Sequence, residues 1–67
     1  MTENAGALVG IITREYAPYD RMPSFTVGWI DYASGRRANP YDANNVEAQA
    51  WDRGAEACMR YRKLASD

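Results

Sequence analysis

Residues 44–65 read NNVEAQAWDRGAEACMRYRKLA, a stretch without proline in which small and aromatic residues recur at helical spacing. One stripe collects the less polar positions, Ala50, Trp51, Gly54, Ala57, Cys58, Tyr61 and Leu64. The opposite stripe is charged and consists of Arg53, Glu56, Arg60 and Lys63. This pattern predicts an amphipathic helix over about residues 45–65, with Asn44 and Glu47 forming a capping box at its start.

Gly54 predicts that a second helix packs closely against this one. Glycine in a helix interior costs up to ~1 kcal/mol relative to alanine, so its place on the apolar stripe favours close backbone approach. A second helix is predicted over about residues 24–35. The residues at helical spacing that predict it are Phe25, Gly28, Trp29, Tyr32 and Ala33. We expect Ser24 as its N-cap, Gly35 as its left-handed C-terminal residue, and Gly28 as the partner of Gly54. The alternation of Phe25, Val27 and Trp29 leaves a strand as the alternative.

The remaining segments contain turn signals and one apolar run. The Asn39-Pro40 step predicts a turn in the connector 36–43, and two prolines predict a loop over residues 14–23. We expect residues 1–6 to be disordered and residues 7–13 to form an arm. The fold class is therefore a single mainly α domain. It has two antiparallel helices joined by a Pro-Tyr turn, with an extended or short β N-terminal arm packed against them.

Length and composition favour a protein that works with a partner. A chain of 67 residues makes at most one domain with a thin core, and such domains often rely on disulfides, metals or partners. One cysteine and no histidine leave a partner or homo-oligomer as the expected support. A lone cysteine, a net charge of −1 and the absence of a basic leader before a short apolar run predict a cytoplasmic protein without a membrane partner.

The chemistry of the side chains predicts that the protein is not an enzyme. Without histidine, Ser/His/Asp and Cys/His arrangements are impossible, and one cysteine cannot build a zinc site. The glycine spacing fits neither phosphate-binding loop, so we expect no metal and no cofactor. Cys58 lies on the apolar stripe and is interpreted as a small buried hydrophobe. An unusual enzyme that uses Tyr41 or Cys58 is the catalytic alternative.

Tyrosine and arginine predict a binding surface, because both are enriched at interaction hot spots. The candidate partner-binding residues are Tyr16, Tyr19, Arg36, Arg37, Tyr41, Arg53, Arg60 and Lys63. They would contact a protein, or they would contact phosphates and stack on bases. The alternative interpretation is a solvated surface, which the balancing acidic residues favour.

An ordered set of motifs over residues 28–58 resembles the ribosome modulation factor family. It comprises Gly28-Trp29, Gly35, Asn39-Pro40-Tyr41, and Trp51 followed by Gly54 and Ala57. The resemblance implies two antiparallel helices with a structural skeleton of Gly28, Trp29, Gly35, Pro40, Tyr41, Trp51 and Gly54. It also implies binding to the small ribosomal subunit and promotion of inactive ribosome dimers. Ala55 stands where the family has a second tryptophan.

Two functions follow from these observations. The first is a non-enzymatic protein, encoded by a phage or mobile element, that docks on a host protein or nucleoprotein complex and inhibits it. A CRISPR-type defence complex is an example of such a target. The alternative is a translation modulator that binds ribosomes or RNA, as the family resemblance implies.

Overall fold

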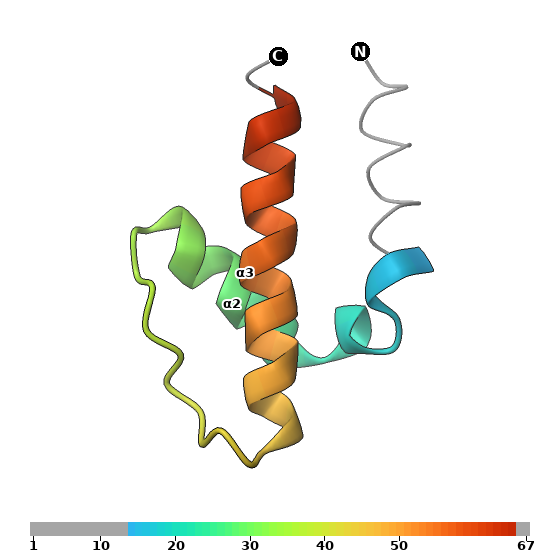
Figure 1. The fold of residues 1–67 in the computed structure, drawn as a ribbon, viewed down its shortest axis with the longest axis vertical. Helices are drawn as coiled ribbons and strands as arrows, with labels where there is room; N and C mark the ends of the chain where they lie inside the picture. The colour runs from blue at the N-terminus through green and yellow to red at the C-terminus, as the bar shows by residue number, and fades with distance from the viewer. Residues whose placement is uncertain (1–13, 66–67) are drawn as a thin grey trace.

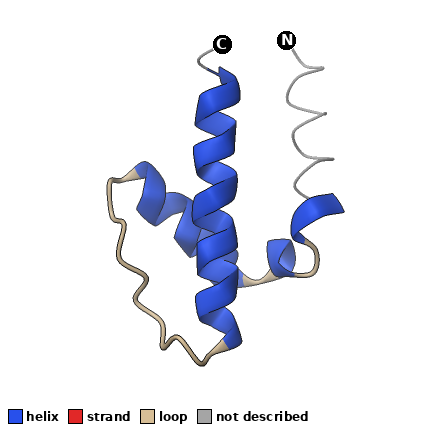
Figure 2. Cartoon of the chain, viewed as in Figure 1, coloured by secondary structure: helices blue, strands red, loops and turns tan. Residues whose placement is uncertain are grey.

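The computed structural model describes residues 14–65, which are mainly helical and contain no strand within that range. Residues 14–16 are helical, and three elements follow: the 3-10 helix η1 (Tyr19–Arg21), α2 (Pro23–Ala33) and α3 (Val46–Ala65) (Figures 1 and 2). The predicted mainly α fold with two packed helices is confirmed, and the strand alternative over residues 25–29 is wrong. The expectations for residues 1–6 and 7–13 lie outside the described residues.

The predicted loop over residues 14–23 is wrong, because its prolines accompany helical turns instead of preventing them. Pro23 is the first residue of α2, where its missing N–H costs nothing and its fixed φ suits a helix. Pro18 directly precedes η1. Met22, not Ser24, is the N-cap of α2. Ser24 is buried inside the first turn, and its hydroxyl has no hydrogen-bond partner among the described residues.

The C-terminus of α2 confirms the prediction for Gly35. This glycine has a φ of 92°, in the left-handed region that favours glycine. Its N–H donates to the carbonyl of Tyr32 at 3.1 Å, and the N–H of Arg36 donates to the carbonyl of Asp31 at 2.7 Å. The two bonds form a Schellman motif, which satisfies terminal carbonyls and ends the helix sharply.

The N-terminus of α3 begins one residue later than the capping-box prediction required. Asn45 is the capping residue, because its Oδ1 accepts the N–H of Glu47 at 3.1 Å and its carbonyl accepts the N–H of Ala48 at 3.0 Å. The N–H of Asn44 instead donates to Oδ1 of Asp42 at 3.0 Å. Asn44 therefore belongs to a turn of the connector that begins at Asp42, and the predicted capping box of Asn44 and Glu47 does not form.

The two helices touch through their backbones at Gly28 and Gly54. Figure 1 shows α2 crossing behind α3. A Cβ atom built on Gly28 would lie 2.8 Å from the carbonyl carbon of Trp51, and one on Gly54 would lie 2.8 Å from that of Phe25. Such distances exclude any side chain at either position. The prediction of close packing at Gly54 is therefore confirmed, with Gly28 as its reciprocal residue.

Trp51 fills the core beside this crossing. Its side chain is 3% exposed, and its Nε1 donates to Oδ2 of Asp31 on α2 at 3.0 Å. The other buried hydrophobic residues are mostly small, namely Tyr16, Phe25, Ala48, Ala50, Ala55, Ala57 and Cys58. Asn39 ties the connector to α3 by donating from Nδ2 to the carbonyl of Ala48 at 2.8 Å.

Neither α2 nor α3 has the combination of length and apolar character that a membrane-spanning helix requires.

Candidate interaction surface

The predicted contact residues lie in separate parts of the molecule. Four of them meet where the N-terminal turns pack on α3, namely Tyr16, Tyr19, Arg53 and Arg60. Arg36 and Arg37 follow α2, Tyr41 lies half-buried in the connector, and Lys63 is exposed in the last turn of α3. The sequence therefore identified residues that the fold does not gather into one surface.

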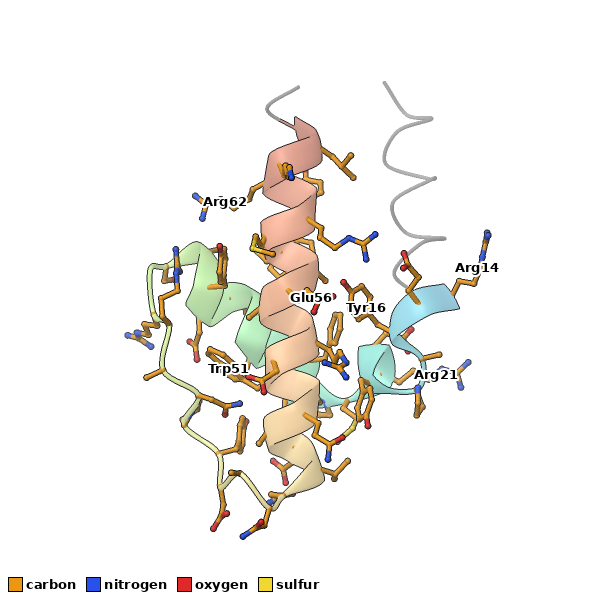
Figure 3. All side chains as sticks on the ribbon, in the orientation of Figure 1. Arg14, Tyr16, Arg21, Trp51, Glu56 and Arg62 are labelled. Carbon is orange, nitrogen blue, oxygen red and sulfur yellow. The ribbon has the colours of Figure 1, made fainter. Side chains whose placement is uncertain are left out.

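Tyr16 belongs to the core. It is 3% exposed, and its ring lies 5.8 Å from that of Phe25. Its hydroxyl donates to Oε2 of Glu56 at 2.8 Å and accepts from Nη1 of Arg60 at 3.1 Å. Arg60 also forms an ion pair with Glu15, with 3.1 Å between Nη2 and Oε2. We call Tyr16, Glu56, Arg60 and Glu15 the Tyr16 brace. Figure 3 shows Tyr16 directed at Glu56 on α3.

The surroundings of the brace favour the neutral form of the Tyr16 hydroxyl and the charged form of the Arg60 guanidinium. Burial raises the pKa of the Tyr16 hydroxyl, the hydrogen bond to Glu56 raises it further, and Arg60 opposes the shift. The bonds from Arg60 to Tyr16 and Glu15 raise the pKa of its guanidinium, which therefore stays charged. The brace is an internal support, and Tyr16 has little surface left for a partner.

Replacing Tyr16 with phenylalanine is expected to cost about 1.5–3 kcal/mol, the usual net value of hydrogen bonding to charged groups, because it removes the bonds to Glu56 and Arg60. It should also weaken the pH dependence of stability. The pKa of Tyr16 in the folded protein lies above its ordinary value of 10.0. The contribution of the neutral Tyr16 hydroxyl to the free energy of unfolding is thus complete below pH 10. It is lost as the pH rises through the pKa that Tyr16 has in the folded protein. Urea unfolding from pH 8 to 12 should therefore give a shallower decline for Tyr16→Phe than for the wild type.

Tyr61→Phe is the control for that measurement, because it removes the hydroxyl of a tyrosine that is exposed and keeps the ring. Its stability should fall with pH as steeply as that of the wild type. Equal slopes for the wild type and Tyr16→Phe would contradict the role given to the brace.

Tyr19 and Arg53 support the same junction. The Tyr19 hydroxyl donates to Oε1 of Gln49 at 2.7 Å, and the Arg53 guanidinium lies 5.9 Å from the Tyr19 ring. In the connector, the N–H of Tyr41 donates to Oδ1 of Asn39 at 2.9 Å, so this turn is fixed by its own asparagine. These contacts stabilise the fold, and both Tyr19 and Tyr41 are half-buried.

Two arginines follow the C-terminal end of α2, and a third, on α3, lies on the same side of the view in Figure 3. Arg36 forms an ion pair with Asp31 at 3.6 Å. The Arg37 guanidinium lies 3.8 Å from the centroid of the Tyr32 ring and donates to the Tyr32 carbonyl at 2.7 Å. Figure 3 shows Arg62 extending from α3 on the same side as the end of α2. We call Arg36, Arg37 and Arg62 the arginine end.

Cys58 lies buried beneath the arginine end. Burial raises the pKa of its thiol, and the nearby charges of Arg62 and Arg37 oppose that shift. A buried thiol with a raised pKa is a poor nucleophile because little thiolate forms. The interpretation of Cys58 as a buried residue is confirmed.

The outward side of α2 is uncharged and mostly apolar, and sequence analysis did not select it as a surface. Ala33, which the spacing placed on the packed face, lies on this side and is exposed. We call Pro23, Thr26, Val27, Ile30 and Ala33 the outer strip. All are exposed except the half-buried Val27, and Ile30 is 55% exposed. Around the edge of α2, the Trp29 ring lies 5.6 Å from that of Tyr61 on α3. The helical spacing of the core-facing residues was enough to predict α2. Nothing in the sequence therefore indicated that Ile30 lies exposed on its other side.

Comparisons of this chain with protein-family models, with curated proteins and with solved structures found no significant match. The resemblance to the ribosome modulation factor family therefore rests on the motifs in residues 28–58.

Proposed function

We propose that this protein is a non-enzymatic binding protein, encoded by a phage or mobile element, that docks on a host protein or nucleoprotein complex and inhibits it. The observation that carries the proposal is the outer strip of α2, an uncharged and mostly apolar surface with Ile30 exposed at its centre. Exposed apolar residues gathered on one helix face are typical of interaction sites. A CRISPR-type defence complex is one target that such a protein would block.

The way α2 is held supports this function. The Gly28–Gly54 contact and the Trp51–Asp31 hydrogen bond fix α2 against α3. A helix that is already ordered loses little conformational entropy when it binds, so more of the contact energy appears as affinity. Inhibition then needs only coverage of a functional surface, without any reaction by the bound protein. The lone cysteine favours action in a reducing cytoplasm.

The arginine end favours the second candidate, a translation modulator that contacts ribosomal RNA. Arg37 lies on the Tyr32 ring, and Arg36 and Arg62 add positive charge on the same side, a combination that suits phosphates and stacked bases. The family resemblance points the same way. Binding of this kind is strongly salt-dependent, because each phosphate contact releases counterions.

Affinity capture of the tagged protein from bacterial lysate at low and high salt tests the two candidates. We expect one discrete protein complex that remains bound at high salt and that loses its activity when the purified protein is added. Ribosomal proteins and RNA released by high salt would favour the second candidate. Capture of neither kind of target would contradict both.

The double variant Arg36→Ala/Arg37→Ala sharpens this test, with the exposed Arg14→Ala as its control. A protein-directed inhibitor should lose no more than about twofold in affinity in the double variant and should stay bound at high salt, because exposed ion pairs contribute little and salt does not screen apolar contacts. An RNA-directed protein should bind several-fold more weakly with a flatter salt slope, while Arg14→Ala should behave as the wild type in both cases.

A further inference from the structure

The outer strip has the spacing of a helix that binds in a groove. Its residues Pro23, Thr26, Val27, Ile30 and Ala33 follow one another at i, i+3, i+4, i+7 and i+10. A helix laid into an apolar groove of another protein uses anchors at this spacing. The opposite side of α2 packs on α3, so both sides of the helix are mostly apolar. This pattern is typical of a helix that other protein surfaces cover on both sides.

The charges of α2 and its flanks indicate the character of that groove. Asp31 is the one charged residue of α2. Its carboxylate accepts a hydrogen bond from Trp51 and forms an ion pair with Arg36. The outer strip itself therefore carries no charge. Exposed arginines lie beyond both ends of α2, Arg21 in η1 and Arg36 and Arg37 after Ala33 (Figure 3 labels Arg21). A complementary surface is apolar in the middle and acidic at its two ends.

The length of α2 argues against a second copy of this chain as the occupant. Eleven residues make a helix of about 16 Å at 1.5 Å per residue. A stable interface buries about 800 Å² on each partner, which one such strip against another short strip would not reach. A concave groove contacts the edges of the exposed strip as well as its centre, whereas a second convex helix contacts mainly the centre. A groove also lets the arginines at both ends contribute.

We propose that the outer strip of α2 inserts into an apolar groove of the target protein, with acidic residues of the target meeting Arg21 at one end and Arg36 and Arg37 at the other. This inference rests on the proposed function and assigns the surface through which it acts. Ile30 is the central anchor, because it is the most exposed large hydrophobic residue of α2 and lies in the middle of the strip.

The test combines site-specific photo-crosslinking with measured affinities. A benzophenone amino acid is placed at Ile30 in the strip or at Gln49 on α3, and cells producing each protein are irradiated. We expect position 30, and not position 49, to crosslink to one target protein. The crosslinked peptide should be apolar and should have acidic residues near the groove ends in the target's structure.

The affinity of the purified target is then measured for Ile30→Glu and for its control, Met59→Glu. Both changes put a carboxylate at an exposed hydrophobic helix position, since Met59 is 47% exposed on α3. We expect Ile30→Glu to bind at least tenfold more weakly and Met59→Glu to bind within about twofold of the wild type. Circular dichroism should show both variants folded.

The possible failures separate the two proposals. A target bound equally well by the wild type and Ile30→Glu would overturn the groove and leave the proposed function standing. Crosslinks from position 30 to a second copy, to residues 7–13 of the same chain, or to RNA would also overturn the groove. The absence of any target in crosslinking and in capture would overturn both.

Discussion

Gly54→Ala is expected to unfold the domain, although alanine is the better helix former by about 1 kcal/mol. The new Cβ would lie 2.8 Å from the Phe25 carbonyl carbon and 3.1 Å from the Trp29 nitrogen. These are backbone atoms of α2, so they yield only if the helices separate. Overpacking typically costs about 1–3 kcal/mol and more against rigid surroundings, whereas a core of this size rarely supplies more than about 3–5 kcal/mol.

Circular dichroism and urea unfolding check this result. Gly54→Leu should be more severe, because its longer side chain must displace α2 further. Gly35→Ala is the matched control: no atom lies within 4 Å of its new Cβ, and its cost comes from the positive φ alone, about 1–2 kcal/mol. A Gly54→Ala protein as stable as the wild type would show that the helices do not touch at this position.

Trp51→Ala should have the second largest effect. It removes the largest buried side chain beside the helix crossing, and tryptophan-to-alanine changes in cores cost about 3–5 kcal/mol. The loss also strands Oδ2 of Asp31, which accepts the indole N–H at 3.0 Å. Because this cost is comparable to the whole stability of so small a domain, we expect an unfolded spectrum at 25 °C.

Trp51→Phe separates packing from hydrogen bonding. The phenyl ring fills much of the space, and Arg36 still pairs with Asp31, so the variant should fold with stability reduced by an intermediate amount. Urea midpoints in the order wild type, Trp51→Phe and Trp51→Ala are expected. A Trp51→Ala midpoint equal to that of the wild type would mean that the indole contributes little to the core.

Local patterns predicted the helices well, because their determinants lie close in sequence. The left-handed Gly35 and the glycine at the crossing each needed only a few neighbouring residues. The predicted apolar stripe of α3 is buried from Ala50 to Cys58, but its last two members, Tyr61 and Leu64, are exposed. The cap of α3 was missed by one residue because two adjacent asparagines compete, and the Asp42 turn takes the first.

The candidate site was harder to predict, because its determinants are distant in sequence or hidden by another pattern. The burial of Tyr16 depends on Glu56, 40 positions later, so no local window reveals that this tyrosine serves the core. The exposed apolar side of α2 is masked by its core side, since a helix that is apolar all round has no strong periodicity. Arg62 joins Arg36 and Arg37 only through the packing of α3 on α2.

The Tyr16 brace also makes the first described turn part of the same folding unit as α3. Its hydroxyl joins two residues of the final helix, Glu56 and Arg60, to the first described turn. A fragment starting after Tyr16 would lose part of the core and leave two opposite charges without their shared partner. A chain that begins at Ala17 should therefore unfold less cooperatively in urea than one that begins at Arg14.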